Sequence, residues 1–122
     1  GGIVMADNND VVIINLDRPR VVRFGHKALK MLCSILDKSF NDLNQVLVNP
    51  GPEELEQIMY CGLLSDARKN GEVLKLEQME DLLDLAEPYT DITDAMNKAM
   101  EMAFPEVEEE KNPQGNVKNP KK

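Results

Sequence analysis

The sequence predicts a mainly α-helical fold, a four-helix orthogonal or bundle-like domain with a short β-hairpin near its N-terminus. Apolar residues recur at helical spacing in four separate segments, and a β-branched run with a turn signal precedes the first of them. Only 4% of the 122 residues are aromatic, so the core must consist mainly of aliphatic side chains and methionines. A chain of this length forms one domain with a single modest core.

We expect that domain to span residues 11–104, between two disordered ends. Residues 1–10 (GGIVMADNND) have no periodic pattern, and Met5 followed by Ala6 resembles a natural start, so residues 1–4 are either an upstream extension or an expression remnant. Residues 105–122 are dominated by Pro, Asn, Gly and charged residues. Such a segment buries too little apolar surface to offset its ordering entropy, which predicts a disordered tail.

The hairpin is predicted over residues 11–24. The run VVIINL is rich in strand formers, Asp17-Arg18-Pro19 is a turn signal, and residues 20–24 alternate with period two. An isolated hairpin is only marginally stable in water. It must therefore pack against the helices, extend a sheet or pair with another chain.

The four helices follow, with a linker expected over residues 39–51. The centre of the second helix is apolar on all sides, which predicts that it is buried on all sides. Gly62 lies in this centre and costs about 1 kcal/mol of helix propensity relative to alanine, so we expect a neighbouring helix to approach closely there. The predicted helices cover Phe24–Lys38, Pro52 to about Lys69, Leu76–Ala86, and about Thr90 to Phe104.

The last of these helices holds three of the seven methionines, namely Met96, Met100 and Met102. Methionine is unbranched and polarizable, so it suits both irregular cores and surfaces that accept varied apolar partners. The methionine face is therefore either plain core or a groove for an amphipathic partner helix.

Charge is unevenly distributed along the chain, whose net charge is −8. Residues 53–110 carry 17 acidic and 4 basic side chains, an excess that repels phosphate backbones and argues against a nucleic-acid partner. This block either forms solvated helix faces or selects a basic partner. No apolar run approaches the roughly 18 residues of a membrane span, and no signal peptide is evident, so we expect no membrane partner and a cytoplasmic location.

No residue pattern predicts catalysis, a cofactor or a metal site. The sequence lacks a nucleophile elbow, a phosphate-binding glycine loop and an EF-hand loop, and His26 is its single histidine. Cys33 and Cys61 both lie in apolar stretches, which favours reduced, buried thiols. Acidic pairs four residues apart, such as Glu77 with Asp81, are typical of exposed helix faces. We therefore expect a binding protein and not an enzyme.

Three segments in order resemble the tail assembly chaperones of long-tailed phages and prophages: INLDRPRVVRFGHKAL (14–29), IMYCGLLSDA (58–67) and LKLEQMEDLLD (74–84). The resemblance implies a non-enzymatic protein of the host bacterial cytoplasm, absent from the mature virion. It would bind the tape measure protein, a long and largely helical chain, and keep it soluble until tail tube subunits polymerise around it. It would be the short form, while a longer frameshifted form recruits the tail tube protein.

Because many copies must coat one client, we also expect a homo-oligomer. In this hypothesis the hairpin braces the first helix and its free edge pairs with a neighbouring subunit. Arg18, Arg20 and Arg23 would meet the neighbour's acidic block, and Met96, Met100 and Met102 would contact the client. The alternative is a small helical adaptor or regulatory protein of a bacterium or phage that binds an amphipathic partner helix.

Overall fold

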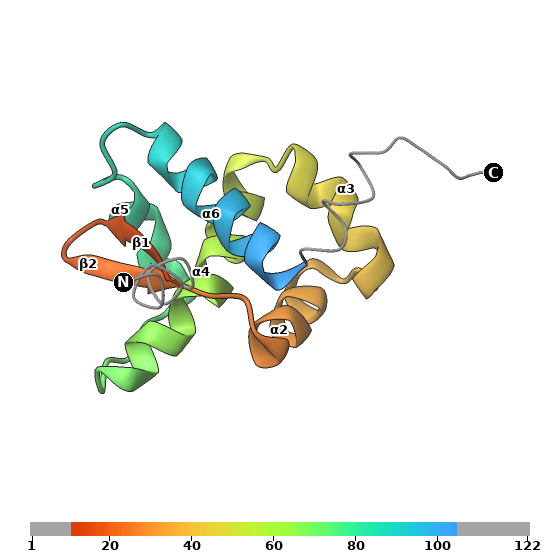
Figure 1. Cartoon of the computed structure of the whole chain (residues 1–122), viewed down its shortest axis with the longest axis horizontal. Helices are drawn as coiled ribbons and strands as arrows, with labels where there is room; N and C mark the ends of the chain where they lie inside the picture. Colours follow the sequence, from red (N-terminus) through yellow and green to blue (C-terminus); the bar gives the residue numbers. More distant parts are fainter. Residues whose placement is uncertain (1–10, 105–122) are drawn as a thin grey trace, which may run out of the picture.

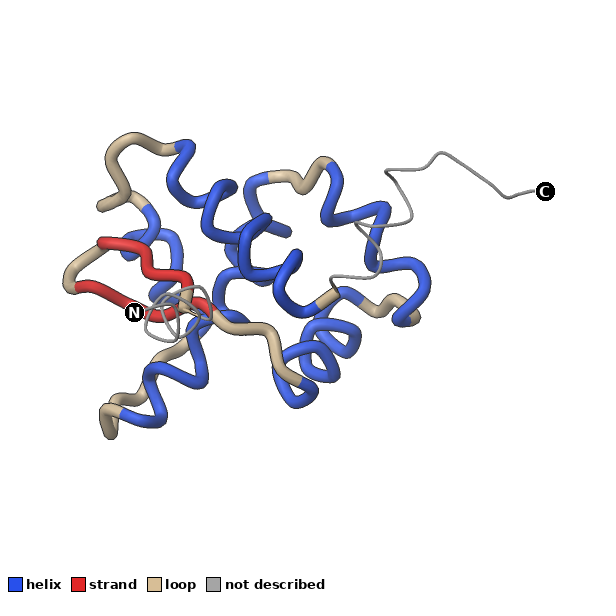
Figure 2. Tube along the Cα trace, in the orientation of Figure 1, coloured by secondary structure: helices blue, strands red, loops and turns tan. Residues whose placement is uncertain are grey.

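The computed structural model describes residues 11–104, so the expectations for residues 1–10 and 105–122 lie outside the described residues. Helices dominate this part of the chain, and a two-stranded hairpin precedes them, as predicted (Figures 1 and 2). The expected number of helices was wrong, because the described residues form five α-helices and two short 3₁₀ turns. In chain order the elements are β1 (Val12–Asn15), β2 (Pro19–Val22), α2 (His26–Leu36), η1 (Phe40–Asp42), α3 (Leu43–Val48), α4 (Pro52–Lys69), η2 (Leu76–Gln78), α5 (Met79–Leu83) and α6 (Thr90–Ala103).

The hairpin is antiparallel and pairs Val12 with Val22 and Asn15 with Pro19. Pro19 is the first residue of β2, a position where its missing N–H is tolerated. Val12 and Ile14 are buried while Ile13 between them is exposed, so one face of the hairpin packs on the core. The alternation predicted for residues 20–24 is also present, because Arg20, Val22 and Phe24 are buried while Arg23 is exposed.

The additional helix lies in the segment that was expected to be a linker. The Ser39 hydroxyl accepts a hydrogen bond from the Asp42 N–H (3.3 Å) and begins η1, which continues into α3. Leu43 and Val46, three residues apart, bury one side of α3. Leu47 and the exposed Val48 are also apolar, so the sequence of this six-residue helix shows no clear helical periodicity.

The helix expected over residues 76–86 is shorter than predicted. It consists of η2 followed by α5, which ends at Leu83. The chain then runs irregularly to Pro88, although Ala86 remains buried. Met79, Leu82, Leu83 and Ala86 are thus all buried, but they do not belong to one continuous helix.

Helix α4 is the central element, as expected, and contacts α2, α5, α6 and β2 (Figure 1). Its N-terminus is capped by the Glu54 side chain, which accepts a hydrogen bond of 2.9 Å from the Gly51 N–H. The helix ends before Gly71, whose φ of +65° is a left-handed conformation that favours glycine. Ile58, Met59 and Leu63 are fully buried. None of the described helices has the length and apolar character needed to cross a membrane.

The close approach at Gly62 involves the hairpin exit and not another helix. A Cβ atom at Gly62 would lie 2.8 Å from Cζ of Phe24 and 3.0 Å from Cγ1 of Val22. The Arg23 N–H donates a hydrogen bond of 2.9 Å to the Gly62 carbonyl oxygen. The glycine therefore lets a strand end, with its backbone, lie directly on α4, which corrects the expectation of a helix neighbour.

Candidate functional site

A groove of about 460 Å³ runs between β1 and α6. All five consecutive residues 11–15 line it, whereas a sheet face would contribute only alternate residues. The groove therefore follows the edge of β1. Its other wall is one face of α6, formed at successive turns by Asp91, Asp94, Ala95, Lys98, Glu101 and Met102.

The edge of β1 that faces away from β2 is open within residues 11–104, where β1 pairs with β2 alone. Hydrogen-bonded and non-hydrogen-bonded pairs alternate along an antiparallel ladder. Pro19 has no N–H, so its pair with Asn15 is a non-hydrogen-bonded one. Four residues further along the same strand direction, the Arg23 N–H points away from β1 to the Gly62 carbonyl oxygen. Both observations indicate that Asn15, Ile13 and Val11 direct their N–H and C=O groups outward.

The side chains around the groove combine apolar and charged groups. Ile13 is 57% exposed, Val11 45% and Met102 40%, so large apolar groups stand at the surface beside the open edge. Acidic side chains outnumber basic ones on the α6 wall. No group of three or more His, Cys, Asp or Glu residues in the described part of the chain is arranged to hold a metal ion. Backbone donors and acceptors, apolar side chains and carboxylates together are suited to binding a polypeptide.

The three candidate methionines divide between core and surface. Met96 is 1% exposed and Met100 9%, so both belong to the core that α6 forms with the other elements. Met102 alone reaches the surface, at the end of the groove. The sequence allowed the methionine face to be either core or a binding groove. The structure places Met96 and Met100 in the core.

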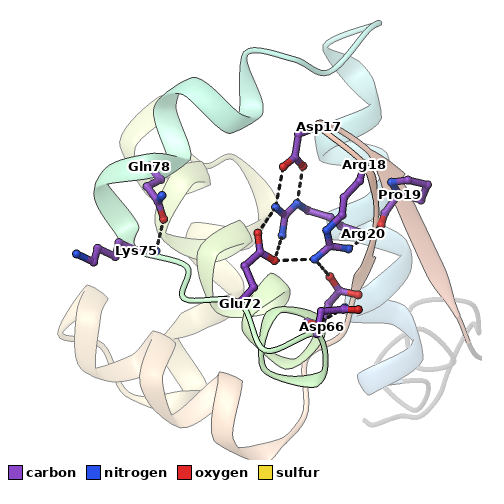
Figure 3. Close-up of polar contacts among 9 residues, drawn as sticks. Asp17, Arg18, Pro19, Arg20, Asp66, Glu72, Lys75 and Gln78 are labelled. Carbon is purple, nitrogen blue, oxygen red and sulfur yellow. Dashed lines mark hydrogen bonds and ion pairs between the residues drawn. The ribbon is translucent and has the colours of Figure 1, made fainter.

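The arginines Arg18 and Arg20 lie in a cluster of ion pairs within the chain (Figure 3). The Arg20 guanidinium, with only 2% of its side chain exposed, lies between two carboxylates. It donates to Asp17 from Nε (2.8 Å) and Nη2 (3.0 Å), and to Glu72 from Nη1 (3.0 Å) and Nη2 (2.7 Å). Arg18 Nη2 donates to Asp66 (2.8 Å) and Glu72 (2.7 Å).

This cluster shifts the titration of its members. Hydrogen bonds from Arg20 and Arg18 lower the pKa of Glu72 to about 2. The hydrogen bond from Arg20 likewise lowers the pKa of Asp17. Hydrogen bonds to Asp17 and Glu72 raise the pKa of Arg20. Glu72, Asp17 and Arg20 thus remain charged at neutral pH, and the cluster fastens the hairpin to α4 and to the loop after it.

The three arginines differ in their surroundings within the chain. Arg20 is buried and pairs with Asp17 and Glu72, whereas Arg18 is half-buried and pairs with Asp66 and Glu72. Arg23 is exposed, with its guanidinium beside Gly25. Together with Met102 it lines a smaller hollow of about 180 Å³. Of the predicted set, the structure therefore brings Arg18 and Arg20 together in the ion-pair cluster, and Arg23 and Met102 together at this hollow.

Several residues of the site were missed by sequence reasoning. Asp94, Lys98 and Glu101 were recognisable as one helix face at spacings of four and three, whereas the continuously apolar run VVII gave no sign of which side chains point outward. Nothing in the sequence indicated that this face lies opposite the strand edge. Glu72 gave no signal either, since its arginine partners are more than 50 residues away.

Neither cysteine forms a disulfide. Cys61 is buried in α4, and this burial raises the pKa of its thiol to about 12. Cys33 is half-buried on α2. A protonated, enclosed thiol such as that of Cys61 is a poor nucleophile, so it packs as a small apolar side chain.

Comparison of the chain with models of protein families, with curated proteins and with solved structures gave no match.

Proposed function

We propose that this protein is a non-enzymatic tail assembly chaperone that binds a phage tape measure protein and keeps it soluble until tail tube polymerisation. The groove along the open edge of β1 is the observation that carries the proposal, because it combines backbone hydrogen-bonding groups with exposed apolar side chains. The ordered resemblance of residues 14–29, 58–67 and 74–84 to that family supports the choice of client.

In this proposal the protein acts in the host bacterial cytoplasm as several copies on one client, and a longer frameshifted form recruits the tail tube protein. A chaperone of this kind requires a surface for apolar segments and a repulsive exterior, but no chemistry. The exterior requirement is met by a net charge of −8, which disfavours aggregation of the complex.

The test is co-expression with a tape measure fragment from the same genome, followed by affinity purification and light scattering. We expect the fragment to become soluble and to co-purify in a complex with several copies of this protein. A fragment that aggregates regardless, while this protein elutes alone, would overturn the proposal and favour the adaptor alternative.

A matched pair of variants tests whether the groove is the surface involved. Ile13→Glu places a charge among the exposed apolar groups of the groove, and we expect it to reduce the soluble fraction of the fragment. Val73→Glu changes a residue that is 76% exposed and not among those that line the groove, so we expect it to leave that fraction unchanged.

A further inference from the structure

We propose that the groove between β1 and α6 binds an extended segment of the client that alternates basic and apolar residues and pairs with β1 as an added strand. That the segment belongs to the tape measure protein rests on the proposed function. Its extended conformation and its alternation of basic and apolar residues are inferred from the groove alone.

The extended conformation follows from the backbone groups at the edge. Val11, Ile13 and Asn15 present N–H and C=O groups outward at every second residue, and the hydrogen bonds described for residues 11–104 do not include a backbone partner for them. A strand laid alongside has the matching repeat, whereas a helix uses its own backbone groups internally and has none to offer.

The basic residues follow from the charge of the α6 wall. Asp91, Asp94 and Glu101 carry three negative charges and Lys98 one positive charge, which leaves this wall with a net charge of −2. Side chains on one face of the added strand would point toward this wall. Basic groups there would be attracted and acidic groups repelled.

The apolar residues of the bound segment are inferred from the exposed side chains on the opposite face of the hairpin. Ile13 and Val11 are exposed on that face, and within residues 11–104 no other strand lies on the outer side of β1. Side chains of an added strand alternate between the two faces, so every second residue would lie beside these two groups. The segment therefore alternates basic residues toward α6 with apolar residues beside Ile13.

A second copy of this chain fits the groove less well. Its own edge, residues 11–15 (VVIIN), has no charged side chain, so pairing two β1 strands would supply no cation opposite the acids of α6. The groove is thus better matched to a basic client segment than to the neighbouring subunit that was expected at this edge.

The test is a titration followed by the amide signals in NMR, with a capped octapeptide of alternating lysine and valine as the probe and alternating glutamate and valine as the control. We expect the lysine peptide to shift the amides of Val11, Ile13 and Asn15 and to bind at least about tenfold more tightly than the glutamate peptide. Equal binding of the two peptides, or shifts confined to other elements, would overturn the proposal.

Charge variants with a matched control test the role of α6. Asp94→Lys with Glu101→Lys reverses two exposed charges in the groove, and we expect it to weaken binding of the lysine peptide about tenfold. Glu80→Lys with Asp84→Lys makes the same change on α5 and directly after it, at exposed residues that do not line the groove, and is expected to alter binding less than twofold. Lys98→Glu should tighten binding.

Ile13→Pro tests the strand pairing, because it removes an outward N–H while the hydrogen bonds to β2 are retained. We expect it to abolish binding of the lysine peptide, whereas Ile13→Ala, which keeps the N–H, binds within threefold of the unchanged protein. Unchanged binding by Ile13→Pro would overturn the pairing. The proposal would also be overturned if the unchanged protein forms a dimer that Ile13→Pro dissociates, because the open edge of β1 would then bind a second copy of the chain.

The same variants separate this inference from the proposed function. If the tape measure fragment co-purifies with the unchanged protein and equally well with the Asp94→Lys, Glu101→Lys variant and with Ile13→Pro, the groove assignment fails while the chaperone function stands. If the lysine peptide binds as expected but no fragment co-purifies, the groove assignment stands and the chaperone function fails.

Discussion

Arg20 and Glu72 lie 52 residues apart in the chain and face each other through two hydrogen bonds of 3.0 and 2.7 Å. Asp17 engages the other side of the same guanidinium, so four of its five N–H groups are bound to carboxylates. This geometry explains how a hairpin of two four-residue strands is held in place, since so short a hairpin is marginal by itself.

Replacing Arg20 by methionine is expected to lower the free energy of unfolding by about 2 to 3 kcal/mol, because Asp17 and Glu72 would face each other without their shared cation. Urea denaturation would measure the loss. Arg23→Met is the control, since Arg23 is exposed on the same segment and outside the ion pairs described for residues 11–104, and its effect should stay within about 0.5 kcal/mol. Equal losses for the two variants would show that Arg20 contributes no more than a surface arginine.

Stability should depend on pH through Glu72. Its pKa is lowered from 4.5 to about 2 in the folded protein, so its contribution is complete above pH 4.5 and is lost as the pH falls toward 2. Thermal unfolding of the unchanged protein and of Glu72→Gln should therefore differ most at neutral pH. The difference in Tm should shrink steadily between pH 5 and pH 2, and a difference that is constant over this range would refute the assignment.

Gly62→Ala is expected to destabilise the protein by about 1 to 3 kcal/mol, although alanine is the better helix former. The added methyl group would meet Phe24 and Val22 at 2.8 and 3.0 Å, and the hairpin exit would have to move. Ser65→Ala on the same helix has no such contact described and should change stability by a few tenths of a kcal/mol. Calorimetry on both variants decides, and a stabilised Gly62→Ala protein would contradict the close contact.

Replacing the methionines of α6 by alanine should cost different amounts of stability, depending on whether the residue is buried or exposed. Met96→Ala leaves a cavity in the core and is expected to cost about 3 kcal/mol. Met102→Ala removes a side chain that is 40% exposed and should cost less than about 0.5 kcal/mol. Denaturation of both variants checks this, and a similar loss at the two positions would place Met102 in the core.

Local signals predicted much of the fold. Pro52 near the start of α4 and Asn70-Gly71 after its end fixed the central helix closely, because helix termini depend on a few neighbouring residues. The strand formers of residues 11–16, the turn signal at residues 17–19 and the alternation over residues 20–24 predicted the hairpin. Helix α3 was missed, because the buried pair Leu43 and Val46 is too short a pattern to distinguish a helix from the linker that was expected there.

The site was harder to predict, because its parts come from distant segments. The groove joins residues 11–15 to residues 91–102, and neither segment alone indicates the other. Arg18 and Arg20 were recognised as notable, but their partners Asp66 and Glu72 are single acids in a strongly acidic block. Sequence pattern could not select them from so many equivalent carboxylates.

The ion-pair cluster also determines when the hairpin can complete its folding during synthesis. The hairpin leaves the ribosome early, but the carboxylate of Glu72 follows Arg20 by 52 residues. At about 5 to 20 residues per second this delay is roughly 3 to 10 seconds. Until then Arg20 lacks one of its two carboxylate partners. The nascent hairpin also lacks the completed helix α4, against which it packs in the folded protein. The segment that is made first is therefore completed only when the central helix has emerged.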